Sequence, residues 1–195
     1  MNENNEIETR ILIAEDELIV GKSIRNTLTS LGYNVLGIVT SGEEVVRQAG
    51  KMLPDIVLMD IKLKGEVDGI EATHQIQCHF NIPVIYLTDF SDDAILQRAK
   101  LTEPFGYTIK PINGRELLTT IEMALYRHKL ETRLKESEQW LNATLHSIGD
   151  AVIATDNIGQ IIFINPVAEG LTGWKQADAV GRDLAEVFHV VNEIS

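Results

Sequence analysis

Asp55-Ile56-Val57-Leu58-Met59-Asp60 is the stretch that decides the fold, because it is a short apolar run that ends on a carboxylate. A run of this length, rich in branched residues and preceded by Pro54, predicts a strand that is buried on both faces, as in parallel sheets. Ligands of open α/β sheets bind in the crevice beyond the carboxyl ends of the strands. Asp60 is therefore a candidate site residue.

Strand-like runs and helical repeats alternate on both sides of this stretch. The predicted strands are residues 10–14, 35–39, 55–59, 83–87 and 106–109. The predicted helices are residues 19–31, 42–49, 69–80, 91–100 and one that begins near Asn113. Five strands that alternate with five helices over about 120 residues predict a five-stranded, doubly wound parallel sheet with right-handed crossovers.

Side chains at helix spacing and capping residues support these helices. Ile19, Ile24 and Leu28 recur near helical spacing in the first helix, and Gly32 stands where a C-terminal cap belongs. Ser41 with Glu44 forms the pattern of a capping box. Asn113 and Glu116 are expected to cap the fifth helix.

The fifth helix has no stop signal, since no Gly or Pro occurs from Leu117 to about Ile148. A helix of roughly 30 residues would reach about 45 Å, beyond the edge of a small domain. Leu134, Leu141 and Ile148 are seven residues apart, which predicts a homodimer through a coiled coil. The other core positions of this heptad pattern are polar, so a solvated linker helix with scattered leucines is the alternative.

After Gly149 the pattern changes to two short apolar runs, residues 151–155 and 160–164, joined by Asp156-Asn157-Ile158-Gly159. These turn residues predict a β-hairpin, and a short helix is expected from Pro166 to Leu171. An isolated hairpin is marginally stable at best. We therefore expect this segment to be part of a larger domain, with any output located after Ser195 or in a partner protein.

Composition excludes several classes of function. A net charge of −12 argues against direct nucleic-acid binding, which needs clustered Lys and Arg. The single cysteine, Cys78, allows no intrachain disulfide, and the acidic N-terminus is unlike a signal peptide. No apolar run approaches the roughly 18–20 residues of a membrane span. A cytoplasmic protein without a membrane segment is expected.

Polar side chains gather at the predicted strand ends. Glu15 and Asp16 follow the first strand and should lie close to Asp60, and three carboxylates in one crevice repel one another unless a cation is present. Hard oxygen ligands with room for water and a phosphate suit Mg²⁺. Thr88 and Lys110, at the ends of the fourth and fifth strands, add a hydroxyl donor and a positive charge. Together these groups are expected to bind a phosphoryl dianion.

These residues resemble the receiver domains of two-component response regulators, over roughly residues 10–127. The match consists of an acidic pair, a phosphoacceptor, a hydroxyl switch residue, an aromatic switch residue and a lysine followed by proline. They are Glu15-Asp16, Asp60, Thr88, Tyr107 and Lys110-Pro111. The resemblance implies a flavodoxin-like receiver fold in which the Lys110–Pro111 bond is typically cis.

The resemblance also implies a function. Asp60 would accept a phosphoryl group from a histidine kinase or phosphotransfer protein, with Mg²⁺ held by Glu15, Asp16, Asp60 and the backbone oxygen of Lys62. Thr88 and Tyr107 would then rearrange the face formed by helix four, strand five and helix five. No enzyme activity is expected beyond this phosphoacceptor chemistry and self-dephosphorylation. A kinase domain after Ser195 is compatible with the resemblance.

Two departures from the family pattern lie beside the site. Residues 63–69 form a connection that is about two residues longer than usual and lacks the common proline. Asp89 stands after Thr88, where the family usually has a small residue. A carboxylate there is expected to affect access of a phosphodonor or the rate of hydrolysis.

A second resemblance, over about residues 138–195, is to the N-terminal half of PAS sensor domains. It is carried by Thr155-Asp156, Gly159, Ile161, Asn165, Ala168-Glu169, Leu171-Thr172-Gly173-Trp174 and Gly181. The expected division of the chain is a flexible N-terminus (1–9), a receiver domain (10–127), a linker helix (128–148) and a partial α+β PAS segment (149–195).

The sequence also has features that bear on other functions. An aspartyl-nucleophile phosphatase would place an Asp-x-Asp pair after the first strand, where this chain has Glu15-Asp16-Glu17. A receiver that is not phosphorylated and only dimerises would be supported by Asp89 and the longer connection. His74 and Cys78 share a helix face, but two ligands do not complete a zinc site. His128 lacks the acid and proline expected around a kinase histidine.

Overall fold

The computed structural model describes residues 8–89, 98–99 and 102–188. The chain divides into two compact units between Glu131 and Thr132, and each is described by itself. Most of the predicted helix 91–100 and the first seven residues of the predicted flexible N-terminus lie outside the described residues. Arg98 and Ala99, which are described, are helical.

The first unit contains the predicted parallel sheet, and its strand order is β2-β1-β3-β4-β5. Every neighbouring pair in it is parallel, so the doubly wound topology is confirmed. The strands are β1 (Arg10–Ala14), β2 (Asn34–Val39), β3 (Ile56–Asp60), β4 (Val84–Thr88) and β5 (Gly106–Ile109). All five residues of β3 are buried, because β3 is the central strand and both of its faces are covered.

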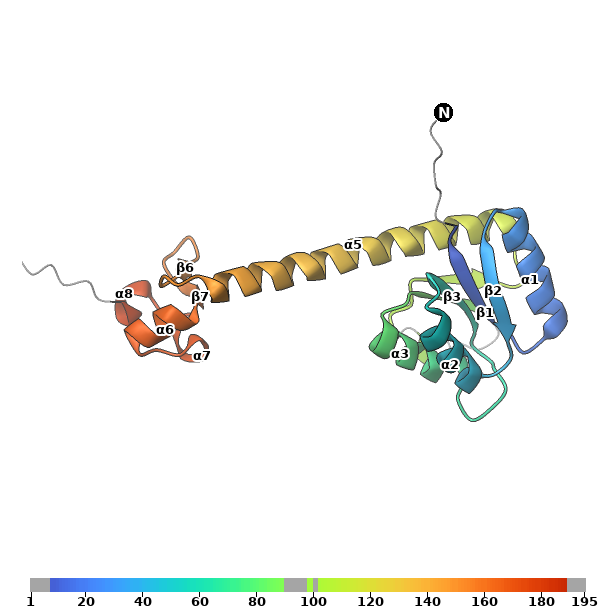
Figure 1. Cartoon of the computed structure of the whole chain (residues 1–195), viewed down its shortest axis with the longest axis horizontal. Helices are drawn as coiled ribbons and strands as arrows, with labels where there is room; N and C mark the ends of the chain where they lie inside the picture. Colours follow the sequence, from blue (N-terminus) through green and yellow to red (C-terminus); the bar gives the residue numbers. More distant parts are fainter. Residues whose placement is uncertain (1–7, 90–97, 100–101, 189–195) are drawn as a thin grey trace, which may run out of the picture. The chain divides into compact units, whose positions relative to one another are not determined.

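Helices cover both faces of this sheet (Figure 1). They are α1 (Leu18–Ser30), α2 (Gly42–Met52), α3 (Gly69–Phe80) and α5 (Gly114–Ser147). Alternate residues of the strands enter two separate cores. Leu58 belongs to the core shared with α1 and α5, whereas Val57 and Met59 belong to the core shared with α2 and α3. This alternation follows from the two-residue period of a strand.

Most of the predicted helix ends are confirmed. Gly32 has φ +88°, Ser41 Oγ accepts from the Glu44 amide at 3.3 Å, and Asn113 Oδ1 accepts from the Arg115 amide at 2.9 Å. Ile19, which stands at helical spacing with Ile24 and Leu28, is 85% exposed and does not join them in the core. It lies in the first turn of α1, where Val20 packs against the core instead.

Helix α5 has a buried part and an exposed part. Leu117, Ile121 and Ala124 are buried against the sheet. Next to them, the Phe105 ring packs edge-on against His128 at 5.3 Å and lies under the Arg127 guanidinium at 5.1 Å. Several large apolar side chains farther along the helix are exposed: Leu130, Leu134, Trp140 and Leu141. Across the described residues, we find no helix with the length and hydropathy needed to cross a membrane.

The second unit contains the predicted hairpin, β6 (Ile153–Thr155) and β7 (Ile161–Ile164), which is antiparallel. Three short helices follow: α6 (Pro166–Thr172), α7 (Gln176–Ala179) and α8 (Leu184–Val187). The small core of this unit consists of Ile161, Ile164, Ala168, Ala179 and Val187. The expected α+β character of this segment is therefore confirmed.

Asn165 links the hairpin of the second unit to the C-terminal end of α5. Its side-chain oxygen accepts from the amides of Val152 and Ala168 at 3.0 and 2.9 Å. Its side-chain nitrogen donates to the Asp150 carbonyl at 2.8 Å and lies 3.3 Å from the Leu145 carbonyl. Asn165 is completely buried, so these backbone groups depend on it rather than on water.

Asn165→Ala is expected to loosen the second unit by about 2 kcal/mol or more, because it removes a helix cap and leaves buried backbone groups unpaired. Amide hydrogen exchange in residues 150–170 should accelerate about 30-fold, the factor that corresponds to this energy. Asn157→Ala, in the exposed turn, is the matched control. Unchanged exchange in Asn165→Ala would contradict the assignment.

Candidate functional site

The site lies where the carboxyl ends of β1, β3 and β5 meet. Because β1 and β3 are parallel neighbours, Glu15 and Asp16, which follow β1, come beside Asp60 at the end of β3. Lys110 follows β5 and reaches Asp60 from the other side of β4. The edge that the sequence predicted as the site therefore brings these four residues together.

The three carboxylates form a compact acidic cluster. One oxygen each from Glu15, Asp16 and Asp60 lies within 4.8 Å of the others. Glu15 is completely buried, and Asp60 is only 8% exposed. It is the one group of at least three potential metal ligands among the described residues. Carboxylate oxygens that converge in this way fit a hard divalent cation such as Mg²⁺.

Lys110 partly neutralises this cluster. Its ammonium nitrogen lies 2.7 Å from Glu15 Oε2 and 2.8 Å from Asp60 Oδ2. Burial alone would lower the pKa of Lys110, but the contacts with Asp60 and Glu15 outweigh burial and raise the pKa above its usual value. Lys110 therefore stays charged over the whole physiological range. The Lys110–Pro111 peptide bond is cis, as the resemblance implied.

Ionisation of Glu15 is unfavourable in the acidic cluster, and this is reflected in its pKa. Burial raises the pKa of the Glu15 carboxyl above its usual value of 4.5. The contact with Lys110 opposes this rise, while the negative charge of Asp60 adds to it. A cation in the cluster would relieve both unfavourable effects, which supports the fit to a metal ion.

The backbone after β3 fixes the position of Asp60. The Lys62 amide donates to Asp60 Oδ1 at 3.0 Å, so both carboxylate oxygens of Asp60 are oriented. Gly69 begins α3 directly against this strand end, where a Cβ would collide with the carbonyl oxygen of Asp60. Glycine is therefore required at position 69, and Asp68 caps α3 by accepting from the amides of Ile70 and Glu71.

Of the two proposed switch residues, Thr88 lies at the carboxyl end of its strand, whereas Tyr107 is the second residue of β5. Thr88 is the last residue of β4 and is 8% exposed. The Tyr107 ring lies 5.8 Å from that of Tyr86, and its buried hydroxyl makes no hydrogen bond to any residue that the structure describes. Burial raises the pKa of Tyr107. Asp89 is exposed and lines a groove beside Lys110.

Two residues beside the site were not recognised from the sequence. Glu43 accepts from the backbone amides of Glu66 and Val67 at 2.8 and 3.1 Å, and Lys64 forms an ion pair with Asp16 at 3.5 Å. As an acid in the first turn of α2, Glu43 is already explained by the helix dipole. No sequence pattern connects it with a loop more than twenty positions away. The unusual length of residues 63–69 is the one sequence feature that pointed to special contacts in this region.

The His74–Cys78 pair, considered for a zinc site, and His128, considered as a kinase histidine, have local contacts of their own. Cys78 Sγ lies 3.6 Å from His74 Nε2 on α3, but no third ligating side chain joins them among the described residues. His128 packs against Phe105, and burial lowers its pKa. Both observations agree with structural roles.

Comparisons with known proteins agree with this geometry. The family model for the response regulator receiver domain matches residues 11–122, more than half of the chain. The model for the PAS fold matches residues 139–194. The chain therefore belongs to the response regulator family of two-component signalling, with a receiver domain followed by a PAS segment.

Individual relatives are similar mainly over the receiver domain. The transcriptional regulatory protein PdtaR of Mycobacterium tuberculosis is 32% identical over 141 residues, which cover 72% of this chain and 68% of PdtaR. The signal receiver domain of a modulated diguanylate cyclase from Desulfovibrio desulfuricans has a TM-score of 0.62 and 43% identity, covering 64% of this chain and 98% of its own. The receiver domain of a sensor histidine kinase from Pseudomonas aeruginosa, with magnesium coordinated in its active-site cleft, has a TM-score of 0.56 and 30% identity, covering 60% of this chain and 98% of its own.

Glu15→Gln is expected to raise the thermal midpoint of the metal-free receiver domain by about 3 °C at neutral pH. A carboxyl with a raised folded-state pKa contributes stability that is fully present below its unfolded-state pKa of about 4.5 and lost as the pH rises through the folded-state pKa. The amide does not titrate. The gain should therefore shrink as the pH falls toward 4.5.

Circular dichroism melts over a pH series with a chelator present would measure this difference. Glu17→Gln, an exposed neighbour with the same change of charge, is the matched control. A lower midpoint for Glu15→Gln at neutral pH would contradict the prediction.

Proposed function

We propose that the chain is the phosphoacceptor module of a two-component signalling protein, and that Asp60 receives a phosphoryl group from a histidine kinase or phosphotransfer protein. One observation carries this proposal: Glu15, Asp16 and Lys110 converge on Asp60 from the ends of two other strands. The geometry combines a nucleophile, a cation site and a fixed positive charge. Those are the groups that phosphoryl transfer requires.

The chemistry would proceed at Asp60. A carboxylate oxygen attacks the phosphorus of a phosphohistidine in line, and the new O–P bond forms as the P–N bond to imidazole breaks, with the electron pair leaving on the imidazole nitrogen. Lys110 balances the charge that accumulates on the phosphoryl oxygens. Glu15, Asp16, Asp60 and the backbone oxygen of Lys62 would hold Mg²⁺, which supplies further charge neutralisation when it is bound.

Signalling would begin at Thr88 and Tyr107. The Thr88 hydroxyl donates to the phosphoryl group, and Tyr107 turns with it, which changes the face formed by helix four, β5 and α5. The contacts of Phe105 with Arg127 and His128 support this route, because they tie the start of β5 to α5. Helix four itself lies largely outside the described residues.

The same proposal divides the chain into a receiver domain (10–127), a linker helix (128–148) and a PAS segment (149–195). The linker helix carries the signal toward the PAS segment, to an output domain or to a partner. The pairing of Glu15, at the end of β1, with Lys110 supports this proposal over the phosphatase alternative, because the carboxylate is not presented to a substrate.

Incubation with Mg²⁺ and acetyl phosphate should add one phosphoryl group to the chain, measured as intact mass. Asp60→Asn should abolish the addition, because the amide is not a nucleophile for phosphorus. Asp178→Asn, at an exposed position of α7, is the control and should be labelled like the wild type. An unmodified wild-type mass, under conditions that label another receiver domain, would contradict the function.

Dimerisation through α5 is the second consequence of the proposal. Leu134 and Leu141 are 63% and 51% exposed and are one heptad apart. Light scattering at tens of micromolar should give twice the chain mass of 21.7 kDa. The double change Leu134→Gln and Leu141→Gln should shift it to the monomer, whereas Lys135→Gln on the same helix should not. A monomeric wild type would remove this expectation.

A further inference from the structure

Residues 62–68 lie between β3 and α3 and include most of the unusually long segment 63–69; they have a defined conformation beside the acidic cluster. Lys64 forms a parallel backbone bridge with Ser41, just before α2. At the end of the connection, the Gly69 amide donates to the Ile61 carbonyl at 3.1 Å. The connection is therefore anchored at its middle and at its end rather than free in solvent.

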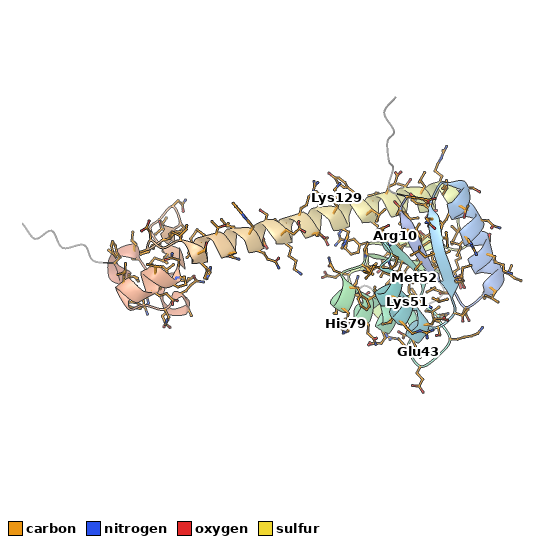
Figure 2. All side chains as sticks on the ribbon, viewed as in Figure 1. Arg10, Glu43, Lys51, Met52, His79 and Lys129 are labelled. Atoms are coloured by element: carbon orange, nitrogen blue, oxygen red, sulfur yellow. The ribbon has the colours of Figure 1, made fainter. Side chains whose placement is uncertain are left out.

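Glu43, at the start of α2, forms a third anchor. Its Oε1 accepts from the amides of Glu66 and Val67, and backbone hydrogen bonds from its own amide, Val67 and Glu66 lower its pKa. Gly65 has φ +112°, and a Cβ at this position would lie 2.5 Å from Glu43 Oε2. Glycine thus allows the backbone to wrap closely around this carboxylate. Figure 2 shows Glu43 at the end of α2 opposite to Lys51 and Met52.

This anchoring brings Lys64 to the acidic cluster. The Lys64 ammonium nitrogen lies 3.5 Å from Asp16 Oδ2 and 3.4 Å from the Asp16 carbonyl oxygen. Asp16 is also one of the three carboxylates within 4.8 Å of one another. The same carboxylate therefore contacts a lysine and belongs to the group that fits a divalent cation.

We propose that Lys64 competes with the metal ion for Asp16, so that binding of the ion displaces the lysine and changes the conformation of residues 62–68. This inference rests on the metal site of the proposed function. Lys64 suits an exchangeable role, because its side chain is 71% exposed and an exposed ion pair is worth little. Lys110, at 16% exposure and with two carboxylate partners, is held much more firmly.

Competition by Lys64 should weaken Mg²⁺ binding by a small but measurable factor. An ion must replace the Lys64 ammonium group at Asp16 and then tolerate a tethered positive charge nearby. The anchors at Ser41 and Glu43 keep the lysine close even after displacement, which maintains its local concentration. Removing the charge should therefore tighten Mg²⁺ binding by about two- to fivefold, the range expected for one exposed ion pair.

Isothermal titration of the full chain with MgCl₂ tests this inference without any phosphoryl donor. Lys64→Gln should bind Mg²⁺ about two- to fivefold more tightly than the wild type. Lys51→Gln, which removes the same charge from the far end of α2, should bind like the wild type. The difference should disappear at about 1 M salt, where the Debye length is about 3 Å.

A second pair of variants tests the anchoring. Glu43→Ala should tighten binding in the same direction by releasing Lys64, whereas Glu44→Ala, with the same loss of charge, should not. Glu43→Ala should add nothing in the Lys64→Gln background, because both changes remove one interaction. Amide chemical shifts of residues 65–67 should move on Mg²⁺ addition to the wild type and much less in Lys64→Gln.

The outcomes separate the two proposals. Saturable binding with equal affinity in the wild type and Lys64→Gln, or weaker binding in the variant, would overturn the competition and leave the metal site intact. No saturable binding in the wild type or any variant would overturn the metal site and the competition with it. Tighter binding in Lys64→Gln alone among the lysine variants would establish the competition.

Discussion

The ion pairs of Lys110 are the interactions on which the site depends. β5 is separated from β3 by β4, and from β1 by β4 and β3, so Lys110 must extend across the strand ends to reach both Asp60 and Glu15. Three carboxylates at one sheet edge would otherwise repel one another where Glu15 has no access to water. The positive charge at the end of β5 therefore permits the acids at the ends of β1 and β3. The cost that remains is visible in the raised pKa of Glu15.

The sheet and most of this site were predictable because they follow from local rules. Buried runs such as residues 55–59 identify strands by composition, and parallel topology then brings their carboxyl ends to one edge. Glu15, Asp60 and Lys110 stand directly at these strand ends, so their proximity could be predicted from their positions in the sequence. Capping residues such as Asn113 could be predicted because their interactions are also local: each accepts from amides of the helix that it begins.

The interactions that escaped prediction connect distant positions through side chains. Lys64 and Asp16 are 48 residues apart, and Glu43 is 23 residues from Glu66. Contacts over such separations do not follow from any periodicity of the sequence. In addition, an acid such as Glu43 in the first turn of a helix is already explained by the helix dipole. Spacing alone also does not predict burial: Ile19 stands at helical spacing with Ile24 but is exposed, because it lies in the first turn of α1.

The two lysines at the site differ in burial, and burial determines how easily each can leave its carboxylate partner. Lys110 is 16% exposed and pairs with two carboxylates, so removing it would leave buried charges unpaired and its release is costly. Lys64 is 71% exposed and can return to water at little cost. Lys110 therefore stays paired with the acids, whereas Lys64 is the lysine that we propose is displaced by an incoming ion. The long connection after β3 thus brings Lys64 to Asp16, while the carboxylate of Glu43 on α2 holds the connection in place.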